Sequence, residues 1–168
     1  MLINMIGFNV AWFGLILLGN TFIPVAAFML LAHFTWFSTH KWERKFVALV
    51  ALIGISVDSL LQFSNVFVFE QQFIPAWLMM IWLCFAATIC HSLAFLSAYK
   101  PLQLLLGFFI APLSYRSGEM FGAVQFGESY LTTYLLLGSI WACLLLLFFA
   151  IKSNSVVSFA KDNDALFN

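Results

Sequence analysis

The sequence predicts an all-α fold, a polytopic membrane bundle of six transmembrane helices with both termini in the cytoplasm. Hydrophobic residues make up 64% of the chain and charged residues 8%, whereas soluble domains carry about 25% charge. The stretch from Ile74 to Ala98 runs 25 residues without Asp, Glu, Lys or Arg. A helix needs about 20 apolar residues to cross a bilayer, so this stretch is long enough to span alone. Five further apolar segments accompany it along the chain.

Each span carries signals at its ends. The first two are joined by Gly19-Asn20-Thr21, a turn so short that it predicts an antiparallel hairpin. The fourth opens with Pro75, whose missing N–H is harmless in a first helical turn. It closes at Tyr99-Lys100-Pro101, an interfacial ring, a cation and a helix breaker. The spans lie at about residues 2–18, 22–39, 46–64, 74–98, 102–118 and 130–151.

Little of the chain lies outside these spans. The segment His40 to Lys45 holds the densest group of charges, in a loop between spans two and three. Residues 1–152 therefore form one six-helix transmembrane domain, and the polar residues 153–168 are expected to form a flexible cytoplasmic tail.

The distribution of Lys and Arg orients the bundle. Short cytoplasmic loops are enriched in these cations. In a six-span arrangement Arg116 falls on one side and all the others on the opposite side, which indicates that both termini are cytoplasmic. The residues on that cytoplasmic side are Lys41, Arg44, Lys45, Lys100, Lys152 and Lys161.

Several classes of function lack any signal. The formal net charge is zero, so nothing favours nucleic acid as a partner. Cys84, Cys90 and Cys143 lie inside apolar runs and fit neither a metal spacing nor a disulfide framework. We expect no metal and no cofactor, and membrane lipids as the surrounding partners.

The main candidate site is built on Asp58. It lies 12 residues into the third span, about 18 Å along a helix. Tyr115, about 21 Å above Pro101, and Trp82, about 12 Å below Ile74, fall at a similar depth. A charged side chain at this depth costs roughly 2.5–3.5 kcal/mol on insertion, so it is tolerated only where it is paired with another group or serves a function.

Two readings of Asp58 stay open. In the first it lines a polar pocket that opens toward the periplasm and acts as a base, proton carrier or cation ligand. In the second Asp58 and Arg116 form a buried pair, satisfied by Gln62 and Tyr115, that only locks helices together. The candidate catalytic residues are Asp58 and Tyr115, and the candidate ligand-binding residues are Gln62, Trp77, Trp82, Arg116 and Glu119.

A second polar cluster is expected from Asn9, Trp12, His91 and Ser92. His91 follows Thr88 and Cys84 at helical spacing, and a histidine titrates near neutral pH. This stripe fits either a cytoplasm-facing site or a histidine that packs helices together. His33, alone in its span, has the same packing interpretation.

The residues also resemble a known family. The resemblance rests on Asn9 with Trp12, the segment Val57-Asp58-Ser59-Leu60-Leu61, Pro75-Ala76-Trp77 with Trp82, and GFFIAPLSYRSGEMFG from Gly107 to Gly122, followed by AVQF. These features are similar to the bacterial domain of unknown function 2878 family, over nearly the whole chain. Glu119 departs from the family pattern, which weakens any catalytic role for it.

The resemblance implies a multi-pass protein of the bacterial inner membrane without an assigned activity. It also implies genes beside cyclopropane-type fatty acyl methyltransferases and flavin amine-oxidase-like proteins, and hence a role in membrane-lipid modification or stress response. We therefore expect a protein that binds or modifies a membrane lipid around Asp58. The alternatives are a small proton- or cation-coupled transporter or channel subunit, and a non-catalytic scaffold that recruits a protein partner at the Lys41–Lys45 loop.

Overall fold

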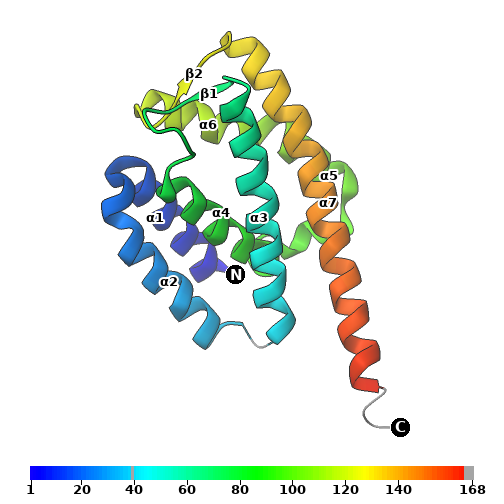
Figure 1. Ribbon diagram of the computed structural model, residues 1–168. Helices are drawn as coiled ribbons and strands as arrows, with labels where there is room; N and C mark the ends of the chain where they lie inside the picture. Colours follow the sequence, from blue (N-terminus) through cyan, green and yellow to red (C-terminus); the bar gives the residue numbers. More distant parts are fainter. Residues whose placement is uncertain (39, 165–168) are drawn as a thin grey trace.

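The computed structural model describes residues 1–38 and 40–164, and it is helical apart from one short β-ladder (Figure 1). This confirms the all-α fold class. The elements in chain order are α1 (Leu2–Leu18), the 3₁₀-helix η1 (Gly19–Phe22), α2 (Ile23–Trp36), α3 (Lys41–Phe63), β1 (Phe67–Val68), α4 (Ala76–Ile89), the 3₁₀-helix η2 (Ala94–Ala98), α5 (Lys100–Leu105), the π-helix η3 (Leu106–Ile110), α6 (Ala111–Met120), β2 (Gln125–Phe126) and α7 (Tyr130–Asp164).

The hairpin predicted at the N-terminus is confirmed. α1 ends at Leu18, and the Gly19 that follows adopts φ +58°, a conformation that glycine reaches without a steric penalty. α2 then packs back against α1. The hairpin tip also binds the start of α4, because the Asn20 side-chain oxygen accepts a hydrogen bond of 3.1 Å from the backbone N–H of Trp77. This bond serves a backbone donor that a helix N-terminus leaves unpaired.

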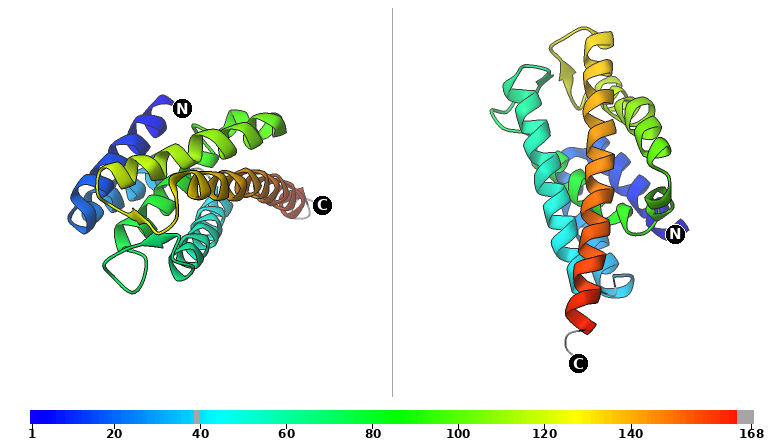
Figure 2. Two further views of the ribbon diagram at one scale, coloured as in Figure 1. Left: turned by 90° about the horizontal axis from the view of Figure 1, so that it is seen from above. Right: turned by 90° about the vertical axis from the view of Figure 1, so that its right-hand side faces the viewer.

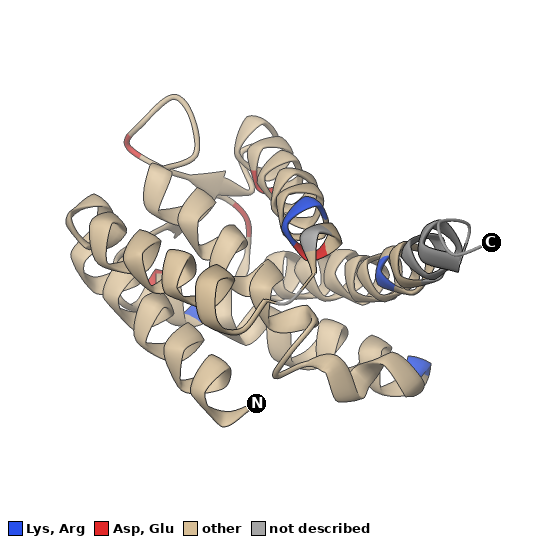
Figure 3. Cartoon of the chain, turned by 90° about the horizontal axis from the view of Figure 1, so that it is seen from below, with Lys and Arg blue, Asp and Glu red and all other residues tan. Residues whose placement is uncertain are grey.

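Three stretches of the described chain are long and apolar enough to cross a membrane: Leu2–Trp36, which contains the hairpin, Trp42–Phe63 and Tyr130–Val156. Figure 3 shows that Lys, Arg, Asp and Glu are sparse along the described part of the chain. α4 has 14 residues, about 21 Å of helix, and so falls short of the roughly 30 Å hydrocarbon core. Six spans and the orientation of the termini stay predictions.

The expected single helix from Ile74 to Ala98 is wrong, because tertiary contacts stabilise a break after Ile89. Lys152 donates a hydrogen bond of 2.9 Å from Nζ to the Ile89 carbonyl, which caps the C-terminus of α4 with a cation. The Asn4 side-chain oxygen accepts bonds from the Ser92 N–H, at 3.3 Å, and from its hydroxyl, at 2.7 Å. These partners replace the backbone bonds that a continued helix would have made.

The expected span 102–118 is helical throughout but contains the π-turn η3. Pro112, at the start of α6, has no N–H to donate to the carbonyl of Phe108, four residues earlier. The neighbouring Phe109 carbonyl accepts a hydrogen bond of 2.8 Å from the Tyr134 hydroxyl on α7. The backbones of η3 and α7 touch, because a Cβ at Gly107 would lie 2.7 Å from Ala142 Cα. This close approach fixes η3 and α6 against α7.

The core lies among α3, α4 and α7, where Trp82 stacks on Trp141 at 5.0 Å. Trp82 also covers Gly54 on α3, where an added Cβ would lie 2.1 Å from the ring. Beyond the core, β1 and β2 pair antiparallel through Phe67 and Phe126.

Two segments differ from the expected arrangement. α7 runs the length of the molecule (Figure 2) and continues through Lys152 to Asp164. The expected tail is therefore helical as far as Asp164, while its last four residues lie outside the described chain and its flexibility stays a prediction. The Lys41–Lys45 segment forms the first turns of α3 rather than a loop, and recruitment of a partner there stays a prediction.

Candidate functional site

Asp58 lies fully buried on α3 and accepts hydrogen bonds from two neighbouring helices. Trp82 Nε1 on α4 donates to Oδ2 at 2.6 Å, and the Tyr115 hydroxyl on α6 donates to Oδ1 at 3.1 Å. The structure thus brings together the three side chains that the sequence placed at one depth. Short bonds from donors to a carboxylate are about twice as strong as bonds between neutral groups.

Both donors are held by aromatic packing. The Trp82 ring lies on Gly54 and stacks on Trp141, and the Tyr115 ring stacks on Phe67 with centroids 5.2 Å apart. Because the rings are fixed from behind, their donor atoms cannot turn away from Asp58 without disturbing the core.

The other groups expected around Asp58 lie elsewhere. Gln62 Nε2 donates to the Gln71 carbonyl at 2.8 Å. Arg116 forms an ion pair with Glu119, and its guanidinium lies 5.1 Å from the centroid of the Tyr130 ring. The predicted Asp58–Arg116 pair is therefore wrong. Arg116 and Glu119 are three residues apart on one helix, so they meet without any help from the tertiary fold.

A cavity of about 640 Å³ lies between α1 and the run from η3 to α6, with α4 as its floor. Apolar and aromatic side chains dominate its lining, so the expected polar pocket is instead a largely apolar one. Trp82 and Tyr115 form part of the wall, while Asp58, to which they donate, is fully buried. The lining includes Phe8, Trp12, Trp77, Ile81, Phe85 and Leu113.

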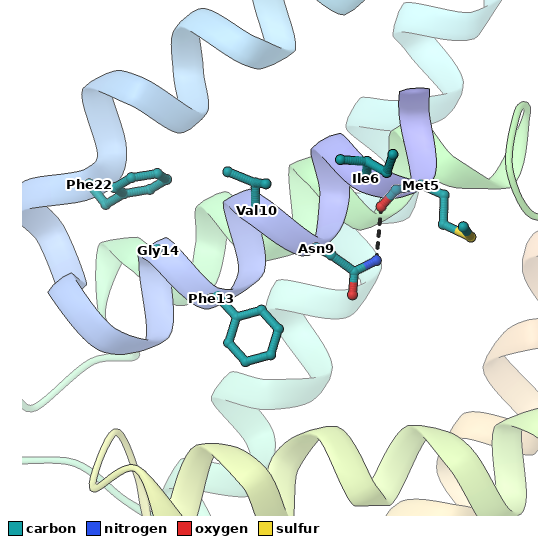
Figure 4. Close-up of a pocket in the computed structure, with 7 residues that line it drawn as sticks. All are labelled: Met5, Ile6, Asn9, Val10, Phe13, Gly14 and Phe22. Atoms are coloured by element: carbon teal, nitrogen blue, oxygen red, sulfur yellow. Dashed lines mark hydrogen bonds between the residues drawn. The ribbon is translucent and has the colours of Figure 1, made fainter. Parts of the chain in front are cut away.

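The second predicted cluster is only partly brought together. Asn9, Trp12 and Ser92 line the same cavity, but the Asn9 amide donates to the Met5 carbonyl of its own helix at 2.9 Å (Figure 4). Figure 4 also shows the shallow groove of about 530 Å³ on the outer face of α1, where Asn9 is again part of the lining. The hydrogen-bond partner of Ser92 is Asn4, described above.

His91 belongs to a different cluster that sequence reasoning missed. His33 Nε2 and His91 Nε2 lie 3.3 and 2.7 Å from the same oxygen, Glu43 Oε1. Glu43 is buried, with 4% of its surface exposed. Helical periodicity in the sequence does indicate that Glu43 faces the interior, because it lies on the same i, i+3, i+7 face as Phe46 and Val50.

Comparison with known proteins gives one match. The model of a family described as "Protein of unknown function (DUF2878)" matches residues 1–147. No curated protein and no solved structure matches the chain.

Proposed function

The chain belongs to the DUF2878 family, and we propose that it is a membrane protein that binds the acyl chain of a lipid in the cavity between α1 and α6. The observation that carries the proposal is the cavity itself, with about 640 Å³ of space and a lining of mainly apolar and aromatic side chains. Small-molecule sites have volumes of about 300–1,000 Å³ and linings of this character.

The membrane setting supports a lipid as the occupant. The apolar stretches Leu2–Trp36, Trp42–Phe63 and Tyr130–Val156 have the length and hydropathy of spans. We further propose a bacterial inner membrane with six spans and both termini inside, since the Lys and Arg positions favour that orientation. An apolar cavity inside such a bundle is in direct reach of acyl chains.

The polar atoms of the cavity wall favour the acyl chain over the head group as the bound part. The indole N–H of Trp82 and the hydroxyl hydrogen of Tyr115 are already donated to Asp58. Ser114 and Ser117 donate their hydroxyls to carbonyls of their own helix. These four donors are therefore already used, and among the described residues no Lys or Arg lines the cavity, so the wall has no cation to pair with a phosphate.

Asp58 has a positioning role in this proposal. It fixes the Trp82 and Tyr115 rings as a rigid wall against which the chain packs. The assignment of Asp58 and Tyr115 as catalytic residues stays a prediction from their depth in the apolar spans, and chemical modification of the lipid stays a prediction that the family resemblance implies.

Photo-crosslinking tests the proposal. The protein is reconstituted with phosphatidylethanolamine that carries a diazirine in its acyl chain, and crosslinked residues are identified by mass spectrometry. We expect crosslinks at Ile81 and Phe85, which face the cavity from α4. Ala111→Trp fills the cavity at the start of α6 and should remove most of these crosslinks.

The matched control is Leu60→Trp, at a position of α3 that is 64% exposed. It should leave the crosslinks at Ile81 and Phe85 at the wild-type yield. If Ala111→Trp folds and those crosslinks persist, or if wild-type crosslinks occur only at outward residues such as Leu60, the cavity does not hold an acyl chain.

A further inference from the structure

Three separate elements bring a metal-binding set of side chains to one point. His33 lies near the end of α2, Glu43 in the first turn of α3 and His91 just after α4. Their ligand atoms all lie within 4.8 Å of one another. We propose that His33, Glu43 and His91 form a binding site for one divalent transition-metal ion.

The geometry is that of side chains aimed at a common centre. Both histidines direct Nε2 at the same carboxylate oxygen of Glu43, at 3.3 Å for His33 and 2.7 Å for His91. The two imidazole rings are perpendicular, with centroids 4.6 Å apart. Because both nitrogens already point at one oxygen, the three side chains need to move little for an ion to bridge them.

Two of the three ligand separations can be compared directly with what a tetrahedral ion requires, and the third, between the two histidines, lies within 4.8 Å. Bonds of about 2.0–2.1 Å hold neighbouring ligand atoms about 3.3 Å apart. The His33–Glu43 separation already has this value, at 3.3 Å. The His91–Glu43 pair, at 2.7 Å, needs to open by about 0.6 Å to reach the tetrahedral spacing. His91 follows the end of α4, where a turn allows such a shift.

The donors select the class of metal. Two imidazoles and one carboxylate are borderline ligands that suit Zn²⁺ and its first-row neighbours rather than Ca²⁺ or Mg²⁺, which prefer oxygen ligands alone. Three protein ligands leave a fourth position for water or a substrate.

The surroundings supply both a shell and an entrance. The Glu43 and His33 side chains are 5% and 10% exposed, while His91 is 22% exposed, so an ion can enter past His91. The Ser38 hydroxyl lies near the Glu43 carboxylate, yet its oxygen is buried without a hydrogen-bond partner in the described structure. A small rotation would let this hydroxyl donate to the Glu43 carboxylate and orient it as a ligand.

The site is separate from the lipid cavity proposed above, and its chemistry does not depend on what fills that cavity. It joins the ends of α2, α3 and α4, so a bound ion stabilises the fold as well as offering a reactive position.

Metal titration of the purified full-length protein in detergent tests the inference. After removal of metals with EDTA, Zn²⁺ is added in competition with a chromophoric chelator, and Co²⁺ is used separately to record the visible absorption of a tetrahedral site. We expect one Zn²⁺ per chain, a rise in Tm on addition of Zn²⁺ that EDTA reverses, and tetrahedral Co²⁺ bands. Since loss of a mere supporting residue costs 10–100-fold in affinity, His91→Ala and Glu43→Gln should each lose at least about 100-fold.

The matched control is His40→Ala, which removes the remaining histidine of the sequence and should keep wild-type affinity. The wild-type titration requires no variant to fold, so it decides the matter alone if the variants are unstable. An unchanged Tm with Zn²⁺ and no saturable binding overturns the proposal. The three side chains would then serve only to hold the helix ends together by hydrogen bonds. Binding that survives His91→Ala but disappears in His40→Ala overturns it as well.

Discussion

Tyr115→Phe removes a single hydroxyl from the wall of the lipid cavity and leaves the ring in place. The hydroxyl donates to Asp58 at 3.1 Å, and the ring keeps its stack on Phe67. A hydrogen bond to a charged group contributes about 1.5–3 kcal/mol, against about 0.5–1.5 kcal/mol for a neutral pair. We therefore expect Tyr115→Phe to lower the free energy of unfolding by about 1.5–3 kcal/mol for an ionised Asp58, and by about 0.5–1.5 kcal/mol for a protonated one.

The measurement is equilibrium unfolding in mixed micelles, followed by circular dichroism. Tyr134→Phe is the matched control, because its hydroxyl donates to the neutral Phe109 carbonyl at an exposed position, and it should cost no more than about 1 kcal/mol. A double-mutant cycle with Asp58→Asn isolates the interaction and should give a coupling of about 0.5–3 kcal/mol.

A Tyr115→Phe protein as stable as wild type would refute the reasoning. So would additivity of the two substitutions within about 0.3–0.5 kcal/mol. Either result would mean that the Asp58–Tyr115 bond does not hold α3 and α6 together, and that the rigid wall has another origin.

Two further substitutions test the packing that shapes the site. Gly54→Ala should lower the free energy of unfolding by about 1–3 kcal/mol, because the new methyl group displaces the Trp82 ring. Gly7→Ala, where the added Cβ makes only an ordinary contact at 3.7 Å, should be neutral or stabilising. Both are measured by thermal unfolding and tryptophan emission, and equal effects would contradict the close contact at Trp82. Asn4→Ala should lower the free energy of unfolding by about 1–3 kcal/mol, because it leaves buried groups of the turn after α4 unpaired. Asn9→Ala, which loses a bond within its own helix, should change the stability by less than about 0.5 kcal/mol. A larger loss for Asn9→Ala in the same unfolding assay would contradict the role of Asn4 in holding that turn.

The parts of the fold that depend on local sequence were predictable. Hydropathy located α1, α2, α3 and the start of α7 within about five residues, because apolar length and helix punctuation are properties of a short window. It missed the end of α7, which continues through polar residues to Asp164. The depth of Asp58, Trp82 and Tyr115 was also predictable, since the helical rise is nearly constant. Their hydrogen bonds follow from that shared level together with aromatic packing.

The polar pairings were not predictable in the same way. Depth gives no information on which side of a helix faces which neighbour, so one of the two readings of Asp58 paired it with Arg116, although Glu119 lies beside Arg116 on the same helix. His33, Glu43 and His91 were missed as a group because His91 lies 48 residues from Glu43, at a separation that carries no periodic signal.

By itself the sequence determined an all-helical, strongly apolar chain with one carboxylate deep in its third helix, because hydrophobicity and helix geometry act over a few residues. Only the tertiary structure decided that α4 stops at Ile89, that the cavity is apolar, and that two histidines meet one glutamate. The physical reason is range: a hydrogen bond or a metal bond tolerates errors of about half an ångström, and one residue of uncertainty along a helix already shifts a side chain by about 1.5 Å and rotates it by about 100°.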